Sequence, residues 1–204
     1  MQQKEVRQMK REYREMILTL PDQENSYTVE GYASTFEPYV LGTIDGVDYF
    51  ERIEPTAFDD ADMADVVFRV DHTGPVYARS SAGTVKLDID GHGLHQTTDL
   101  SRTEKARGLY EDIKAGNYPK MSFAFAVAEG GDDYDRKTHT RTIKHISKIF
   151  DVSPVAFPAN PGTELSARDY LDGVIEMEKA ERLEAEQRER DRKKLVLKLR
   201  LMGV

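Results

Sequence analysis

Five histidines and no cysteines limit the nucleophilic chemistry open to this chain of 204 residues. Without cysteine, the candidate nucleophiles are serine, threonine, lysine and the carboxylates, and a serine needs a base that accepts its proton. His72 has the most informative setting, because it follows an apolar run at 66–70 and precedes a Gly-Pro turn. An imidazole at the end of a strand is held in place and reachable, which makes His72 a candidate base. The alternative is a surface histidine at a turn.

Ser122 lies in the segment Lys-Met-Ser-Phe-Ala-Phe-Ala-Val, residues 120–127. In a strand, Ser122, Ala124 and Ala126 share one face, and the two phenylalanines point to the other. The phenylalanine face predicts core, and the face of small residues predicts an open groove for a substrate. The alternative is a serine among small residues that serve packing alone.

Asp151 stands in an apolar segment, between Lys-Ile-Phe and Val-Ser-Pro. Burying a carboxylate is costly unless it is paired, and pairing with a histidine N–H would also fix the tautomer of the imidazole. Asp151 is therefore a candidate to orient the base, unless it sits in an edge strand facing water. His145 is the competing candidate, because a second imidazole can orient the first one more weakly.

Other groupings of chemically able residues predict no site. His92 and His95 fall in an expected turn and strand, where residues three apart point to opposite faces, so no metal site is expected there. The chain lacks a calcium-loop spacing and the glycine motifs that bind phosphates and dinucleotides. We therefore expect neither a metal nor a cofactor.

The composition indicates which classes of binding partner are not expected. A formal net charge of −8 argues against general nucleic-acid binding. No apolar run approaches the roughly 18 residues of a transmembrane helix, and the charged start of the chain lacks a signal-peptide core. We expect a protein that does not bind membranes and that stays in the cell that makes it.

Alternation and turn signals predict many short strands and few helices. Strands are expected at 27–36, 66–72, 76–80, 84–90, 93–100 and 121–127, in a hairpin at 40–54, and at 140–156 as one strand or two broken at Pro154. A short helical stretch is expected at 56–65, and a helix at 103–116 that begins in the capping-box pattern of 101–104. Residues 129–133 are expected to form a turn or an exposed loop.

The fold class that follows is α+β and mostly β. A small antiparallel barrel or a strongly bent sheet is the natural architecture for such strands, because closure removes exposed edges. Residues 1–20 are expected to form an arm or helix, with a short strand at 16–20 as the alternative. A folded domain is expected over 21–170, and a long charged helical tail over 171–204.

Several short motifs follow one another along the chain in a defined order. They are Val-Glu-Gly-Tyr-Ala-Ser-Thr-Phe at 29–36, Phe-Glu-Arg-Ile-Glu-Pro-Thr-Ala-Phe at 50–58, Asp-His-Thr at 71–73, Gly-Leu-His at 93–95, Ile-Lys-Ala-Gly-Asn-Tyr-Pro-Lys-Met-Ser-Phe-Ala-Phe at 113–125 and Phe-Asp-Val-Ser-Pro-Val-Ala-Phe-Pro-Ala-Asn-Pro at 150–161. The series resembles the prohead protease family of tailed phages over about residues 27–165. The most specific blocks are Met-Ser-Phe-x-Phe and Val-Ser-x-Val-x-Phe-Pro-Ala-x-Pro.

The resemblance implies a herpesvirus assemblin-like fold, a small antiparallel β-barrel flanked by helices, with 21–170 as the protease domain. It implies a serine endopeptidase that cuts the major capsid protein, the scaffold and itself inside the assembling prohead, in the host cytoplasm. It implies Ser122 as nucleophile and His72 as base, with Asp151 preferred over His145 as the third member. The loop with Ala159 and Asn160 is a candidate source of oxyanion donors. By analogy with assemblins, a homodimer is an option.

Two positions depart from the family's usual pattern. Asp71 stands where asparagine is common, and Ala124 stands where glycine is common. Alanine still keeps that face of the strand small. Two alternatives remain open for the function: an inactive, scaffold-like capsid assembly protein that organises subunits through its charged helix, or a fragment of a protease–scaffold fusion. The tail is a candidate for targeting into the shell or for removal on maturation.

Overall fold

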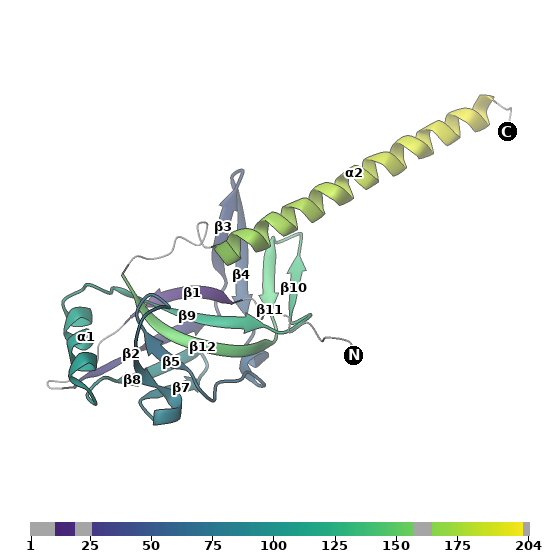
Figure 1. The fold of residues 1–204 in the computed structure, drawn as a ribbon. Helices are drawn as coiled ribbons and strands as arrows, with labels where there is room; N and C mark the ends of the chain where they lie inside the picture. Colours follow the sequence, from purple (N-terminus) through teal and green to yellow (C-terminus); the bar gives the residue numbers. More distant parts are fainter. Residues whose placement is uncertain (1–10, 19–25, 157–164, 202–204) are drawn as a thin grey trace, which may run out of the picture. The chain divides into compact units, whose positions relative to one another are not determined.

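The computed structural model describes residues 11–18, 26–156 and 165–201 (Figure 1). The chain divides into two compact units, with the boundary between Ala167 and Arg168. The first unit is mostly β and contains one α-helix, and the second consists of most of a long helix. No helix within the described ranges is long and apolar enough to cross a membrane.

A five-stranded sheet carries the three residues that the sequence singles out. Its strand order is β1-β9-β12-β5-β6, and β12 pairs in parallel with β5 while the other neighbours are antiparallel. Figure 1 shows β1, β9 and β12 side by side. The strands are β1 (Glu12–Ile17), β5 (Val67–Arg69), β6 (Val76–Arg79), β9 (Lys120–Val127) and β12 (Ile146–Val155).

Two smaller sheets complete the β structure of the first unit. One has the order β10-β11-β4-β3, with strands β3 (Tyr39–Ile44), β4 (Val47–Ile53), β10 (Asp132–Asp135) and β11 (Thr140–Ile143). The other has the order β2-β8-β7, with strands β2 (Thr28–Thr35), β7 (Val85–Ile89) and β8 (Gly93–Asp99). Most pairs are antiparallel, and β11 pairs in parallel with β4.

Local sequence explains the hairpin between β3 and β4. Asp45 and Gly46 both take positive φ values, 52° and 79°. Two consecutive residues in this region make a turn whose twist matches that of the flanking strands, and Asp-Gly is a preferred pair for it. The hairpin predicted at 40–54 is confirmed.

Helix α1 (Glu104–Lys114) begins at Thr103, whose hydroxyl accepts the backbone N–H of Ala106. The helix predicted over 103–116 is confirmed, but its cap is Thr103 and not Ser101. Two 3₁₀ helices, η1 (Pro55–Phe58) and η2 (Ser80–Ala82), lie before β5 and after β6 in the sequence. The helical stretch expected over 56–65 is thus confined to a single 3₁₀ turn.

Three further expectations need correction. Residues 12–17 form strand β1, within the segment expected to be an arm or helix. The break in 140–156 falls between β11 and β12 and not at Pro154, which pairs with Met121 inside β12. Residues 132–135, expected in part as loop, form β10 against β11. For β1 and for the break before β12, partner strands remote in the sequence decide the conformation, whereas β10 pairs with the next strand in the chain.

The expected closed barrel is not seen. Among the described residues the strands form three separate hydrogen-bonded sheets, and none of these closes on itself. The mostly β class with a long C-terminal helix is confirmed, whereas the barrel stays an expectation. The sheets instead share one apolar core, which contains Phe58, Phe68, Phe123, Phe125 and Ile149 among other buried side chains.

The second unit consists of most of helix α2 (Leu165–Leu201). Its side chains from Glu181 to Lys198 are all exposed. Pairs of opposite charge four residues apart, such as Glu184 with Arg188 and Glu189 with Lys193, support the helix. The helix begins six residues before residue 171, where the sequence predicted the helical tail to start.

Candidate active site

His72 lies in a tight turn directly after β5. The turn is closed by a hydrogen bond from the backbone N–H of Thr73 to the carbonyl of Val70, and its two central residues, Asp71 and His72, have φ values of 46° and 56°. L-residues with a β-carbon rarely take this left-handed conformation, and aspartate and asparagine tolerate it best. The turn is tied to the end of β12, because Asp71 Oδ1 accepts the backbone N–H of Ala156.

Ser122 enters the site from β9, the second strand of the five-stranded sheet. Its Oγ lies 2.8 Å from Nε2 of His72. The other ring nitrogen of His72, Nδ1, lies 2.6 Å from Oδ1 of Asp151 on β12. A carboxylate only accepts, so Nδ1 carries the proton and Nε2 is free to accept the hydroxyl proton of Ser122. This is the arrangement that activates a serine as nucleophile.

Asp151 is almost fully buried, with 1% of its surface exposed. Besides His72, its Oδ1 accepts a hydrogen bond of 2.6 Å from the hydroxyl of Ser153, two residues further along β12. Ser153 is itself buried and pairs with Ser122 in the register of β12 and β9. Two donors therefore compensate the burial of this carboxylate.

The register of the sheet explains how His72 fits above it. Ala124 pairs with Tyr13 of β1 on one side and with Asp151 on the other. The imidazole contacts Asp151 and Ser122, and its ring centroid lies 4.4 Å from that of Tyr13. The three residues that contact His72 thus lie next to Ala124 in the sheet, on the same face of β9 and its neighbours.

The face with Ser122, Ala124 and Ala126 is not open as expected. All three residues are buried, with exposed fractions of 2%, 0% and 1%. Both edges of β9 are also paired, with β1 and with β12. The prediction erred because the sequence does not show that β1 and the turn of His72 cover this face. His72 keeps 17% of its side chain exposed, so the site reaches solvent at the imidazole.

His145, the alternative third member, lies apart from these residues. It is exposed, and its backbone contacts Ala128 and Gly131 just beyond the far end of β9. Ala128 follows Ser122 by six residue steps along β9, which correspond to roughly 20 Å. The structure thus joins His72 to Asp151 and Ser122 and places His145 elsewhere.

A comparison with protein families supplies the decisive observation on identity. Residues 13–174 match the family model described as caudovirus prohead serine protease. The chain belongs to this family. It is therefore a serine protease-type hydrolase of phage capsid maturation, which acts in the assembling prohead within the host. The comparisons with curated proteins and with solved structures gave no match.

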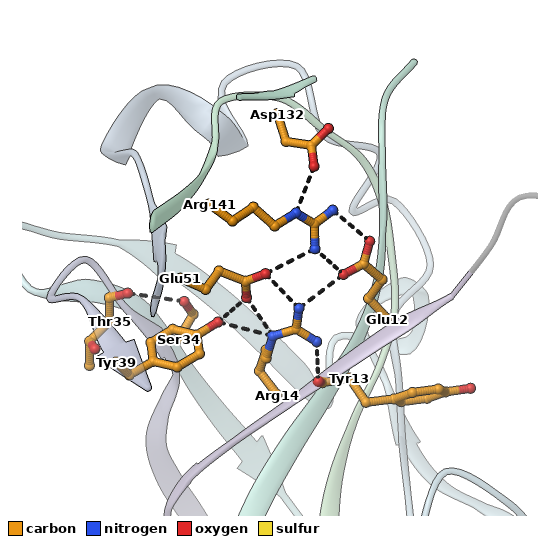
Figure 2. Close-up of polar contacts among 9 residues, drawn as sticks. All are labelled: Glu12, Tyr13, Arg14, Ser34, Thr35, Tyr39, Glu51, Asp132 and Arg141. Carbon is orange, nitrogen blue, oxygen red and sulfur yellow. Dashed lines mark hydrogen bonds and ion pairs between the residues drawn. The ribbon is translucent and has the colours of Figure 1, made fainter. Parts of the chain in front are cut away.

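The match begins at Tyr13, so the prohead protease domain includes β1. The sequence predicts an arm or helix for residues 1–20, with a short strand at 16–20 as the alternative, because the charged residues there look solvated. In the structure, Glu12 and Arg14 of β1 join Glu51 of β4 and Arg141 of β11 in a buried cluster of charged side chains (Figure 2). We call these four residues the ion cluster. Asp132 and Tyr39 extend it at its margins.

The ion cluster keeps its charges although it is buried. Burial alone would raise the pKa of Glu51, but the charge and hydrogen bonds of Arg14, together with the charge of Arg141, hold that pKa below its ordinary value of 4.5. Burial also opposes the charge of Arg141, yet the carboxylates of Glu12 and Glu51 raise its pKa above the ordinary value. Each charge is balanced by hydrogen bonds to the opposite sign, as buried ions require.

The remaining candidate residues form no second site. Contrary to the expectation of opposite faces, His92 and His95 both contact the ring of Tyr32, at 4.4 and 5.1 Å between centroids. No group of three or more His, Asp or Glu side chains in the described part of the chain is placed to hold a metal ion. Ala159 and Asn160, the candidate oxyanion donors, lie outside the described residues.

Proposed function

We propose that this protein is the maturation endopeptidase of a tailed-phage prohead and that Ser122, His72 and Asp151 are its catalytic residues. The observation that carries the proposal is the hydrogen-bonded series from Ser122 Oγ through the imidazole of His72 to Asp151, with distances of 2.8 and 2.6 Å. Membership of the prohead protease family supports it independently.

The roles follow from the hydrogen-bond directions. Ser122 Oγ attacks the carbonyl carbon of the scissile peptide while Nε2 of His72 takes its proton. The imidazolium formed in this step is stabilised by Asp151, which keeps its hydrogen bond to Nδ1. His72 then returns the proton to the leaving amine, and water repeats the sequence to release the acyl group. We assign Asp151 rather than His145 as the third member, because Asp151 bonds Nδ1 of His72 and the backbone of His145 contacts residues near the far end of β9.

The substrates that fit this role are the major capsid protein and the scaffold of the same phage, and copies of the protease itself. Enclosure in the prohead raises the effective concentration of enzyme and substrate, so even modest affinity suffices there.

The exposed charged helix α2 is suited to contacts that bring the enzyme into the shell. A homodimer, the option left by analogy with assemblins, is tested by the molar mass of the purified protein in solution.

Coexpression with the major capsid protein of the same phage tests the proposal. We expect a defined N-terminal segment of that protein to be lost, as seen by intact-mass spectrometry. Ser122→Ala should abolish the cleavage, because loss of a triad serine or histidine lowers kcat by about 10⁶-fold in a serine protease. His72→Ala should behave alike, and Asp151→Asn should be slower by about 10⁴-fold.

The matched control is Ser81→Ala. Ser81 is an exposed serine whose hydroxyl donates to Asp65, away from His72. Unchanged cleavage by Ser81→Ala and none by Ser122→Ala supports the nucleophile. Cleavage that continues in folded Ser122→Ala would overturn it, and absence of cleavage by the folded wild type would favour an inactive, scaffold-like assembly protein.

A further inference from the structure

Strand β1 places an aromatic residue beside the base of the candidate site. β1 pairs with β9 in antiparallel register, with Tyr13 opposite Ala124 and Glu15 opposite Ser122. Side chains directly opposite each other in a sheet lie on the same face. Tyr13 therefore lies on the face of Ala124 and Ser122, where His72 lies, whereas Arg14 lies on the other face, over the ring of Phe125.

The ring of Tyr13 packs against the imidazole of His72. The ring centroids are 4.4 Å apart and the planes are inclined at 55°. Both ring nitrogens of His72 are already used, Nδ1 toward Asp151 and Nε2 toward Ser122. Contact with a third side chain restricts rotation of the imidazole away from these two bonds. An aromatic ring within about 6 Å also attracts a cation, which the imidazole becomes during proton transfer.

The ion cluster fixes Tyr13 from the opposite side of its strand. Figure 2 shows the side chain of Tyr13 pointing away from Glu12 and Arg14, its neighbours in β1. Arg14 forms two bonds to Glu51, of 2.5 and 2.7 Å. Its Nη1 also donates to the backbone carbonyl of Tyr13 at 2.6 Å. The backbone of Tyr13 is thus bound directly to a buried network that is anchored in another sheet.

We propose that Tyr13 is a positioning residue for His72, held in place by the ion cluster. The inference rests on the proposed function, since it takes His72 as the base that serves Ser122. Tyr13 acts through the imidazole and makes no bond to the substrate. The N-terminal strand is accordingly part of the catalytic apparatus and not only the edge of a sheet.

The test uses the full chain and a small alkyl fluorophosphonate as probe. Ser122 Oγ attacks phosphorus, the P–F bond breaks and fluoride leaves, while His72 accepts the hydroxyl proton. The labelled fraction and the labelling rate are measured by mass spectrometry at several probe concentrations. In Tyr13→Ala we expect the maximal labelling rate to fall by about ten- to a hundredfold, a loss typical of misplaced catalytic groups. The half-saturating probe concentration should stay unchanged.

Two further variants separate positioning from folding. Tyr13→Phe keeps the ring and should label at nearly the wild-type rate. Arg11 lies just before β1 and packs on Phe150, with its Cζ 4.2 Å from the ring centroid. The variant Arg11→Ala should also be labelled at the wild-type rate. If Tyr13 had a purely structural role, Tyr13→Ala would lower the final labelled fraction, and the folded molecules would still be labelled at the wild-type rate.

The outcomes distinguish this inference from the proposed function. Slow but complete labelling of Tyr13→Ala, with normal labelling of Tyr13→Phe, supports the positioning role. A wild-type rate in Tyr13→Ala, or an equal loss in Tyr13→Phe, overturns it. Absence of Ser122 labelling in the wild type, or equal labelling of Ser122→Ala, overturns the proposed function instead.

Discussion

Asp71 and His72 hold a backbone conformation that costs roughly 1–2 kcal/mol per residue with a β-carbon. Their turn persists because the surrounding contacts fix it: the backbone N–H of Asp71 donates to the carbonyl of Pro154, and the Asp71 carboxylate accepts from Ala156. Strained residues of this kind gather at functional sites. Here the strained turn directs the imidazole back across the sheet, toward Ser122 and Asp151.

Ser153 offers a test of how the buried carboxylate is supported. Ser153→Ala removes the hydroxyl that donates to Asp151 and leaves the carboxylate with His72 as its remaining side-chain donor among the described hydrogen bonds. Hydrogen bonds to charged groups contribute about 1.5–3 kcal/mol. We expect the free energy of unfolding in urea to fall by that amount, and labelling of Ser122 by the fluorophosphonate to slow.

Ser147→Ala on the same strand is the matched control. The Ser147 hydroxyl donates to the backbone carbonyl of Ala126, a neutral acceptor. Such bonds contribute about 0.5–1.5 kcal/mol, so this variant should lose less stability and keep the wild-type labelling rate. Equal behaviour of the two variants would show that Ser153 does not support Asp151.

Between elements, the ion cluster connects β1 to the sheet that contains β4 and β11. Glu51 contributes most to this connection, because it bonds both Arg14 and Arg141 and is fully buried. Glu51→Gln would leave two buried arginines short of a counter-charge. Removing one partner of a buried ion pair costs about 3–5 kcal/mol, and we expect that loss in the free energy of unfolding at pH 7.

The same residue predicts a dependence of stability on pH. The pKa of Glu51 in the folded protein lies below its ordinary value of 4.5. A group with a lowered folded-state pKa stabilises the fold fully above its ordinary pKa and loses that contribution as the pH falls through the folded value. The difference in unfolding free energy between wild type and Glu51→Gln should therefore be constant from pH 8 to about pH 5 and shrink below 4.5.

A half-exposed ion pair provides the control for this measurement. Arg52 and Glu54 lie 3.1 Å apart with 46% and 30% of their side chains exposed. Glu54→Gln should cost less than about 1 kcal/mol, since solvent screens such pairs. A loss in Glu51→Gln no larger than in Glu54→Gln would mean that the ion cluster does not hold β1 in place.

Sequence alone was sufficient where local signals decide the structure. The hairpin turn at Asp45 and Gly46, the capped helix α1 and the strand at β9 are local features, and each was predicted. Strand β1 was missed because Glu12 and Arg14 look solvated until their partners from β4 and β11 are known. The break before β12 likewise depends on pairing with strands far away in the sequence.

The residues of the candidate site also differ in whether the sequence alone could predict them. Ser122, His72 and Asp151 each lie in a recognisable motif, so the sequence alone predicted them as candidate catalytic residues. Tyr13 lies before the first of these motifs, and Ser153 lies in the block at 150–161 without any sign there that it bonds Asp151. Their part in the site follows from sheet register and one side-chain bond. The covered face around Ala124 escaped prediction for the same reason, since the covering residues come from β1 and the turn after β5.

At the scale of the whole molecule, the charges of helix α2 are unevenly distributed. Glutamates dominate residues 176–189, and lysines and arginines dominate from Arg190 to Arg200. The exposed leucines Leu183, Leu195 and Leu197 lie on the same helix. Opposite charges four residues apart, such as those of Glu184 and Arg188, stabilise this helix.

Removal of residues 178–204 tests whether the reactivity of Ser122 depends on the C-terminal helix. The family match ends at residue 174, and every described residue of the candidate site lies in the first unit. Most of the deleted side chains are exposed. We expect the shortened chain to label Ser122 with the fluorophosphonate within about twofold of the full-length rate, because changes at exposed positions usually alter the stability of a fold by no more than about 0.5 kcal/mol. Full-length protein carrying Ser122→Ala serves as the blank. A folded, shortened chain that no longer labels would show that α2 takes part in forming the site, and the tail could then not be a mere targeting segment.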